Sequence, residues 1–168
     1  LKDRWKGGRA FIIGNGPSLK QQDLLPLRDE LTFFTNWGFL HPDYEAIRPK
    51  FHCSSSHEIF GGWGAKNPRL NEDFATKFAA RSAGVRKVFS WRFEESLRAA
   101  GTFAPDELDF MLFDRPKFLI DEIGGIDLDV RKIMHDGYTV VITFCMPLAV
   151  HLGVKEIFLL GCDCDYGI

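Results

Sequence analysis

The pentapeptide Gly14-Asn15-Gly16-Pro17-Ser18 has the composition of a loop that could bind a phosphate. Glycine permits a sharp turn, and a helix that begins in such a loop presents free N–H groups and the positive end of its dipole to an anion. The loop is not a dinucleotide fingerprint, because Leu19 stands where the third glycine would be, and it is not a P-loop, because no Gly-Lys-Ser/Thr follows. Gly14–Ser18 therefore predicts either a phosphate site or a plain strand-to-helix turn.

Asn36 is a second candidate ligand-binding residue, since it stands near the position where a dinucleotide-binding fold places an acidic residue for the ribose hydroxyls. Its amide can both donate and accept, so it could contact a base or a ribose. An asparagine that only turns the chain after a strand is the alternative. Ser54 and the two serines after it could add hydroxyl groups, or they could be ordinary solvated loop residues.

Asp163-Cys164-Asp165 has the D-x-D pattern with which many glycosyltransferases hold a divalent metal on a donor diphosphate. A surface loop that happens to contain two aspartates is the alternative, because oxygen ligands for Mg²⁺ are common surface residues. The histidines show no metal-binding spacing, and none of them is assigned as a general base. They are His41, His52, His57, His135 and His151.

The elements that would position these residues alternate between strands and helices. The expected strands are Arg9–Ile13, Leu31–Thr35, Lys50–Cys53, Lys87–Trp91 and Lys155–Leu160. The expected helices are one of about two turns from Ser18, with a Ser18/Gln21 capping box, to Pro26, then Asn71–Arg81, and Thr143–Leu152 closed by Gly153. This alternation predicts an α/β fold with a mainly parallel sheet and helices on both faces.

Length and composition predict one domain over residues 1–168, with an insertion or lid at about 92–126. A net charge of -2 gives no basic field for nucleic acid, and no apolar run reaches the roughly 20 residues that span a bilayer. The four cysteines lack zinc spacing, so a reducing cytoplasm is expected. The chain begins with Leu and stops just after a strand, so it is expected to be the N-terminal part of a longer protein.

Three blocks of the sequence together resemble the bacterial sialyltransferases that decorate lipooligosaccharide. They are Phe11–Leu19, Phe34–Asn36, and Leu148-Ala149 with Leu152–Asp163, which cover under half of the chain. The motility accessory factors and the archaeal hydroxymethylpterin pyrophosphokinases share similar pieces. Residues of about 55–138 match none of these families.

The resemblance implies a Rossmann-like domain that binds a CMP-activated nonulosonic acid sugar. The loop of Gly14, Asn15, Gly16, Pro17 and Ser18 would face the phosphate and ribose, and Asn36 would contact the cytidine or ribose. Gly161 and Asp163 match the family's Gly-x-Asp block, and Asp163 is expected to be structural, accepting backbone N–H bonds.

Two further roles are implied less directly by the resemblance. Where the family has Thr-Ser-Gly, this chain reads Tyr138-Thr139-Val140-Val141, and Thr139 or Thr143 is the nearest substitute contact for the sugar carboxylate. Tyr166 is the candidate to hold the leaving phosphate, and the family's general-base histidine would lie beyond the last residue. The catalytic assignment therefore rests on Tyr166 alone.

The expected function is transfer of a sugar, expected to be a nonulosonic acid, from a CMP-sugar donor to a glycan or protein acceptor, with no metal cofactor. One alternative is a pterin-type pyrophosphokinase, which would need ATP and Mg²⁺, and another is a non-catalytic nucleotide-binding domain. The expected location is cytoplasmic, with peripheral attachment at the inner membrane and homo-oligomerisation left open.

Overall fold

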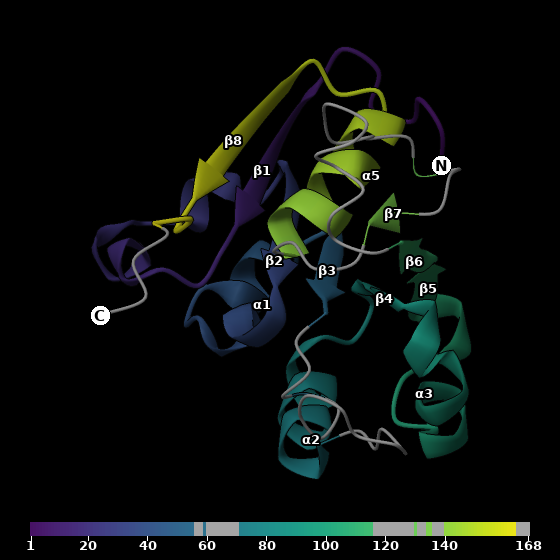
Figure 1. The fold of residues 1–168 in the computed structure, drawn as a ribbon. Coiled ribbons are helices and arrows are strands. Elements are labelled where there is room, and N and C mark those ends of the chain that lie inside the picture. The colour runs from purple at the N-terminus through teal and green to yellow at the C-terminus, as the bar shows by residue number, and fades with distance from the viewer. Residues whose placement is uncertain (56–58, 60–70, 116–129, 131–133, 136–139, 164–168) are drawn as a thin grey trace.

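The chain forms a six-stranded, all-parallel sheet in the order β5-β4-β3-β2-β1-β8 (Figure 1). The computed structural model describes residues 1–55, 59, 71–115, 130, 134–135 and 140–163. The strands of the sheet are β1 Arg9–Ile13, β2 Leu31–Thr35, β3 Phe51–Ser54, β4 Arg86–Ser90, β5 Leu108–Met111 and β8 Glu156–Leu160. A second, two-stranded sheet pairs β6 (Phe113–Arg115) with β7 (Met134–His135). The expected α/β fold with a parallel sheet is confirmed.

Both faces of the sheet are covered, which explains why its central strands are almost continuously apolar. All five residues of β2 are buried. On one face the core includes Ile13 and Phe34 with side chains of the helices that follow β2, β3 and β4. On the other face Ile12 and Phe33 pack with Phe144 of the segment before β8. Neighbouring residues of one strand thus enter opposite cores, as the two-residue period of a strand requires.

The helices in the described part of the chain are short. The α-helices are α1 Tyr44–Ile47, α2 Glu72–Arg81, α3 Glu94–Ala100 and α5 Met146–His151. The 3-10 helices are η1 Pro17–Gln21, η2 Leu25–Leu27, η3 Asn36–Leu40, η5 Trp91–Phe93 and η6 Pro105–Glu107, and η7 (Val141–Cys145) is one turn of π-helix that continues into α5. Residues of α1, α2 and α3 belong to the first core, and residues of η7 and α5 to the second.

Three expectations about local structure need correction. The two-turn helix after β1 is two 3-10 helices instead, and η1 has Gly16 at its N-cap, so the Ser18/Gln21 capping box does not form. The expected helix before β8 starts as a π-helical turn. Residues 94–111 of the expected insertion form α3 and β5, which is an edge strand of the main sheet, while 116–126 lie outside the described residues. Gly153 has φ +83 after α5, as a helix-closing glycine should.

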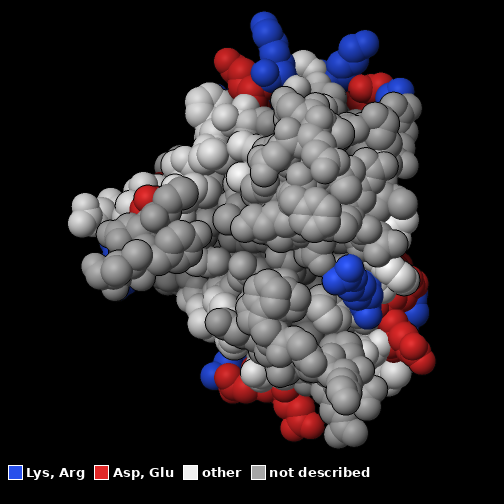
Figure 2. Space-filling model, in the orientation of Figure 1, with Lys and Arg blue, Asp and Glu red and all other residues white. Residues whose placement is uncertain are grey.

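No helix among the described residues is both long enough and apolar enough to cross a membrane. On the face shown in Figure 2, the described Lys and Arg side chains lie beside Asp and Glu side chains rather than in one broad basic patch.

Candidate functional site

The carboxyl ends of β1 and β8 form the topological switch point of the sheet. From β1 the strands advance one by one to β5, and the chain then returns to the other side of β1 as β8. The connection from β1 to β2 packs on one face of the sheet and the segment before β8 packs on the other, and ligands of open α/β sheets bind at such a point. The two segments are joined by backbone hydrogen bonds from Gly14 N to Leu160 O and from Gly16 N to Gly161 O, both 2.8 Å long.

Glycine is required where these two segments touch. A Cβ on Gly14 would lie 2.3 Å from the carbonyl oxygen of Gly161, and one on Gly16 would lie 2.4 Å from Asp163 Oδ2. Gly161 has φ +60, and its Cβ would lie 2.4 Å from Leu19 Cγ. The glycines of the loop thus serve close contact between two parts of the chain, and they do not by themselves indicate a bound phosphate.

Asp163 takes the position at the start of η1 that a phosphate was expected to take. The backbone N–H of Ser18 donates to Asp163 Oδ2 at 2.8 Å, and the Ser18 hydroxyl donates to Oδ1 at 2.6 Å. These two bonds lower the pKa of Asp163, so the carboxylate is ionised at neutral pH. The expectation that Asp163 accepts a backbone N–H is confirmed, and the N–H of Ser18 is thereby engaged within the protein.

Asn15 joins the ends of β1 and β2. Its Nδ2 donates to the carbonyl oxygen of Thr35 at 3.1 Å and contacts Thr35 Oγ1 at 3.3 Å. The Thr35 hydroxyl in turn donates to the carbonyl oxygen of Ile13 at 3.1 Å. Asn15 is exposed, so its amide oxygen is the part of the side chain that is left for a ligand.

Asn36 turns the chain at the end of β2, in a left-handed conformation with φ +44. Its side-chain oxygen accepts the N–H of Ser55 at 3.3 Å, and its carbonyl oxygen lies 2.8 Å from Nε2 of His52. Both contacts hold the connection after β2 against β3. Asn36 therefore turns the chain after β2, which was one of the two roles that the sequence allowed. It is not among the residues that line the neighbouring cavity.

A cavity of about 600 Å³ opens between the loop after β1 and η3 after β2. Its lining residues are Asn15, Gly16, Pro17, Leu19, Lys20, Gln22, Trp37, Gly38, Leu40, His41, Pro42 and Asp43. The walls combine an indole ring, an imidazole and a lysine with the backbone of the glycine loop. Small-molecule sites have this mixture of apolar walls and a few polar groups.

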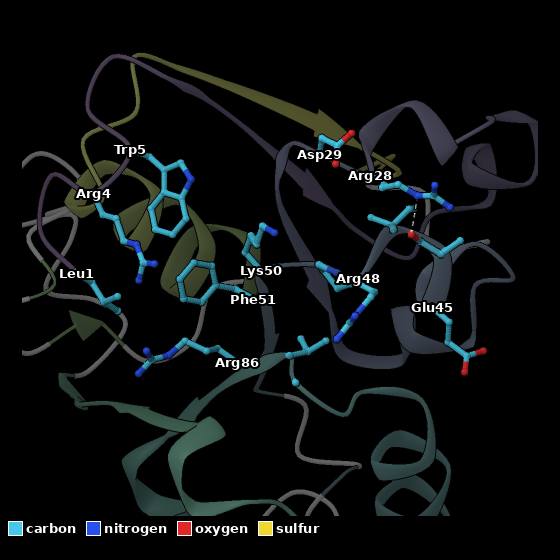
Figure 3. A pocket seen from close by; sticks show the side chains of 15 residues that line it. Leu1, Arg4, Trp5, Arg28, Asp29, Glu45, Arg48, Lys50, Phe51 and Arg86 are labelled. Carbon is cyan, nitrogen blue, oxygen red and sulfur yellow. Dashed lines mark hydrogen bonds between the residues drawn. The ribbon is translucent and has the colours of Figure 1, made fainter.

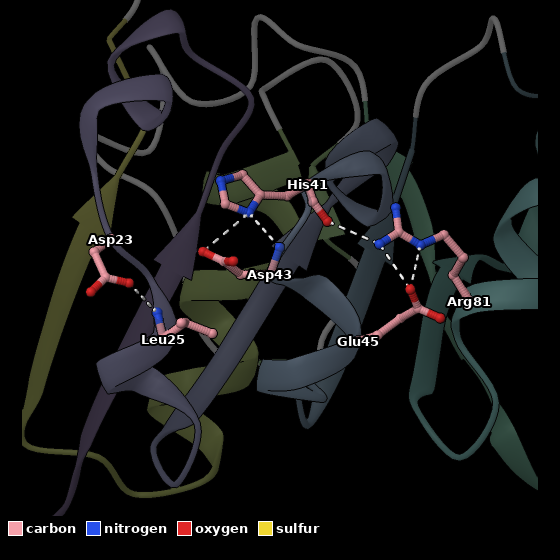
Figure 4. Close-up of polar contacts among 6 residues, drawn as sticks. All are labelled: Asp23, Leu25, His41, Asp43, Glu45 and Arg81. Carbon is pink, nitrogen blue, oxygen red and sulfur yellow. Dashed lines mark hydrogen bonds and ion pairs between the residues drawn. The ribbon is translucent and has the colours of Figure 1, made fainter.

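His41 is fixed in the cavity wall through Nδ1 of its ring and through its backbone carbonyl oxygen (Figure 4). The N–H of Asp43 donates to His41 Nδ1 at 3.2 Å, and Arg81 of α2 donates to the carbonyl oxygen of His41 at 3.2 Å. Arg81 also forms an ion pair with Glu45 at 3.0 Å. Since Nδ1 accepts a hydrogen bond, the neutral ring carries its proton on Nε2.

Trp37 and His41 line the cavity but were not predicted as site residues from the sequence. Both follow the carboxyl end of a strand that lies beside the glycine loop, and this position could have indicated them. The expected site residues Gly14 to Ser18, Gly161 and Asp163 do lie together.

The other expected site residues are not brought into the cavity by the described part of the structure. Ser54 ends β3, is fully buried, and its hydroxyl has no hydrogen-bond partner within the described part of the chain. Thr139 and Tyr166 lie outside the described residues. No metal-binding group of three or more His, Cys, Asp or Glu side chains is present among the residues described, which exclude Asp165, so the D-x-D hypothesis stays a prediction.

Comparison with known proteins adds no relative to this description. No family model matches the chain, and no curated protein or solved structure matches it either.

Proposed function

We propose that this chain binds the nucleotide of a CMP-activated sugar and is part of a glycosyltransferase of the sialyltransferase-like type. The observation that carries the proposal is the cavity of about 600 Å³ between the Gly14–Ser18 loop and η3. Its volume falls in the range of about 300–1,000 Å³ that is usual for small-molecule sites. Its position beside the switch point is where open α/β sheets bind nucleotides.

The lining residues fit the parts of a nucleoside monophosphate. Trp37 is half-buried and offers a flat ring on which a pyrimidine can stack. The amide oxygen of Asn15 can accept from a ribose hydroxyl or an exocyclic amine. Lys20 is exposed at the cavity and offers a cation for the phosphate.

The charge near the glycine loop supports a donor with one phosphate over a donor with two. Asp163 is ionised and engages the N–H of Ser18, so negative charge is already present at this rim. Lys20 is the one Lys or Arg among the described residues that line the cavity. A nucleoside diphosphate would bring more negative charge and would call for a divalent cation.

In the proposed reaction an acceptor hydroxyl oxygen forms a bond to the anomeric carbon of the sugar. The bond from that carbon to the phosphate oxygen breaks, CMP leaves with the electron pair, and the acceptor's proton passes to a general base. His41, with its proton on Nε2, acts in this scheme as a hydrogen-bond donor to the leaving phosphate rather than as that base.

The test is binding of CMP to the chain, followed by tryptophan fluorescence and thermal unfolding. We expect CMP to raise the unfolding temperature and to change the Trp37 fluorescence, and ATP to leave the Trp37 fluorescence unchanged, with EDTA and Mn²⁺ changing neither result. Asn15→Ala should weaken binding by about 1–3 kcal/mol, the cost of leaving a polar partner unpaired. Trp37→Phe should remove the fluorescence change, and Trp5→Phe, outside the cavity, should retain it.

Other ligand profiles would identify the alternatives. A change of Trp37 fluorescence with ATP and Mg²⁺ but not with CMP would favour the pterin-type pyrophosphokinase and overturn the proposal. A CMP affinity that rises more than about tenfold with Mn²⁺, or roughly 1.4 kcal/mol, and that loses this gain in Asp165→Asn would favour a diphosphate donor. CMP binding without sugar transfer by the full-length protein would favour a non-catalytic nucleotide-binding domain.

A further inference from the structure

A second cavity, of about 710 Å³, lies at the opposite edge of the sheet, where the strands begin. It is lined by the segment before β1 and by residues that precede or start β2, β3 and β4. Parallel strands all start at one edge, so these segments converge although they are far apart in sequence. None of its lining residues lines the cavity beside the glycine loop.

The walls of this cavity carry an excess of positive charge. The lining cations are Arg4, Arg28, Arg48, Lys50 and Arg86, and the lining carboxylates are Asp29 and Glu45. The chain as a whole has a net charge of -2, so the local excess is a property of the cavity and not of the composition. A recess lined by one sign of charge concentrates counter-ions of the other sign.

Three of these cations are available to a ligand. Arg86 is already held by Asp109 through bonds of 2.6 and 2.8 Å, and Arg28 Nε donates to the carbonyl oxygen of Ala46 at 3.2 Å. The remaining cations are Arg4, Arg48 and Lys50, none of which forms an ion pair with a described residue.

Figure 3 shows how the cationic groups are arranged around Phe51. The head groups of Arg4 and Arg86 lie on one side of the cavity, beside Leu1, and Arg48 lies on the other side. An anion with several charged oxygens can reach more than one of these groups at once. A single small anion would leave some of them without a partner.

Arg48 occupies a backbone position that would favour glycine. It follows α1 in the left-handed region, with φ +48 and ψ 72, and its N–H bonds to the carbonyl oxygen of Tyr44 at 2.9 Å. A side chain is unfavourable in this conformation, and such strain collects at ligand sites. The end of α1 therefore explains why residue 48 is left-handed, but it does not explain why the residue is an arginine and not a glycine.

An aromatic wall stands beside the cations. The ring of Trp5 meets Phe51 edge to face at 6.2 Å, and the Arg4 guanidinium lies 5.1 Å from the centre of the Trp5 ring. Backbone bonds from Trp5 N to Leu152 O, at 2.9 Å, and from Asp3 N to His151 O, at 3.1 Å, fix this segment on the end of α5. The Trp5 ring is therefore positioned to report on a ligand in the cavity.

We propose that the cavity at the amino edge of the sheet is a binding site for an oligophosphate group, with Arg4, Arg48 and Lys50 supplying charge-assisted hydrogen bonds. Guanidinium and ammonium groups recognise phosphate oxygens in this way. Inorganic pyrophosphate and nucleoside diphosphates share the chemistry, and the experiment separates them.

The test is a titration of the chain with pyrophosphate at low ionic strength, followed by tryptophan fluorescence. We expect saturable binding with a Kd below about 1 mM that weakens as salt is added. Trp5→Phe should abolish the signal and Trp37→Phe should retain it. A signal that depends on Trp37 instead would place the anion in the other cavity and overturn the proposal, whatever the result with CMP.

Arg48→Gly separates a binding role from a structural one. Glycine relieves the left-handed conformation, so the unfolding temperature should be equal to or above that of the wild type. Pyrophosphate binding should weaken by about tenfold or more, the loss expected for one charge-assisted hydrogen bond. Lys155→Ala, which removes an exposed cation at the same edge but outside the cavity, is the matched control and should bind normally. Unchanged binding in both Arg48→Gly and Arg4→Ala would overturn the proposal.

Nucleotides identify the source of the phosphate group. Two results together would assign a nucleotide as the ligand. ADP would bind more tightly than pyrophosphate, and Trp5→Phe would reduce the rise in unfolding temperature that ADP causes. Equal affinity for ADP and pyrophosphate would assign the phosphates alone. Adenosine that binds as tightly as ADP would contradict the proposal, because the cationic side chains would then contribute nothing.

Discussion

Gly161 and Gly101 share a backbone conformation but differ in their surroundings. Both have φ +60. A Cβ on Gly161 would lie 2.4 Å from Leu19 Cγ, whereas a Cβ on Gly101 would meet no atom within 4 Å. We expect Gly101→Ala to lower the free energy of unfolding by about 1 kcal/mol, the cost of the left-handed conformation. Gly161→Ala should lower it by about 1–3 kcal/mol more, because Leu19 must also move.

Urea denaturation of the two variants measures this difference. Equal losses of stability would mean that Leu19 adjusts freely, and the close contact between the segments after β1 and β8 would then carry no packing energy.

His52 is a fully buried imidazole whose burial lowers its pKa to about 3. The unfolded chain binds a proton near pH 6.5, and the folded chain binds it only near pH 3, so stability falls as the pH drops through that range. Between pH 6.5 and pH 5 the loss from this residue should be about 2 kcal/mol. Urea denaturation at pH 7 and pH 5 measures it.

The control for His52 is the slope of stability against pH. His52→Gln should reduce that slope, although it also lowers stability at pH 7 by disturbing the contacts with Tyr44 and Asn36. A wild-type slope in His52→Gln would contradict the assignment.

Site residues could be predicted from the sequence only where they form a pattern of adjacent residues, as in Gly14–Ser18. The glycines after β1 are recognisable as a local pattern, although the structure needs them for close contact with the segment after β8 and not for a positive φ. The partner of Ser18 is not recognisable, since Asp163 lies 145 residues away and meets it only through the pairing of β1 with β8. Trp37 could not be predicted as a site residue from a local pattern. It lines the cavity because β1 and β2 are neighbours in the sheet, which places η3 beside the loop after β1.

At the scale of elements, Lys87 of β4 forms an ion pair with Glu107 of η6, the turn that leads into the neighbouring strand β5. The Lys87 side chain is 1% exposed and also donates to the carbonyl oxygen of Ser82 at 2.7 Å. Glu107→Gln would leave a buried ammonium without its carboxylate, and we expect the free energy of unfolding to fall by about 3–5 kcal/mol.

Lys87→Met is the matched variant, because it removes the charge and fills similar space beside Phe78 and Phe103. It should cost less than Glu107→Gln, since no unpaired charge stays buried. Chemical denaturation of both variants gives the order, and the reverse order would show that the pair is solvated in the folded state.

The elements were predictable to different degrees. β1 and β2 have the bounds expected from their apolar runs, because a strand buried on both faces shows such a run. β5 was placed in an insertion, since an edge strand with only Leu108 buried carries a weak apolar signal. The segment after β1 has a helical pattern, but Pro17 and Pro26 limit it to short 3-10 turns.

At the scale of the whole molecule, the sheet is unevenly covered. β2 is buried along its length, whereas Phe158 and Leu159 of the edge strand β8 are 43% and 44% exposed. We expect the amides of β8 to exchange with deuterium much faster than those of β2, because edge strands open locally at a lower cost. Hydrogen exchange followed by mass spectrometry tests this order. Protection of β8 equal to that of β2 would show that another chain covers this edge in solution.

The pairing of β1 with β8 also fixes when the candidate site can exist during synthesis of the chain. β1 leaves the ribosome before the other strands of the sheet, and β8, with Asp163 after it, leaves last among the described ones. Strands that are far apart in sequence pair slowly. The edge of β1 that pairs with β8 is therefore unpaired while the intervening strands assemble. A ribosome-bound chain stopped before β8 should therefore lack the Ser18–Asp163 contact, and the loop after β1 is held against the segment after β8 only once residue 163 has been made.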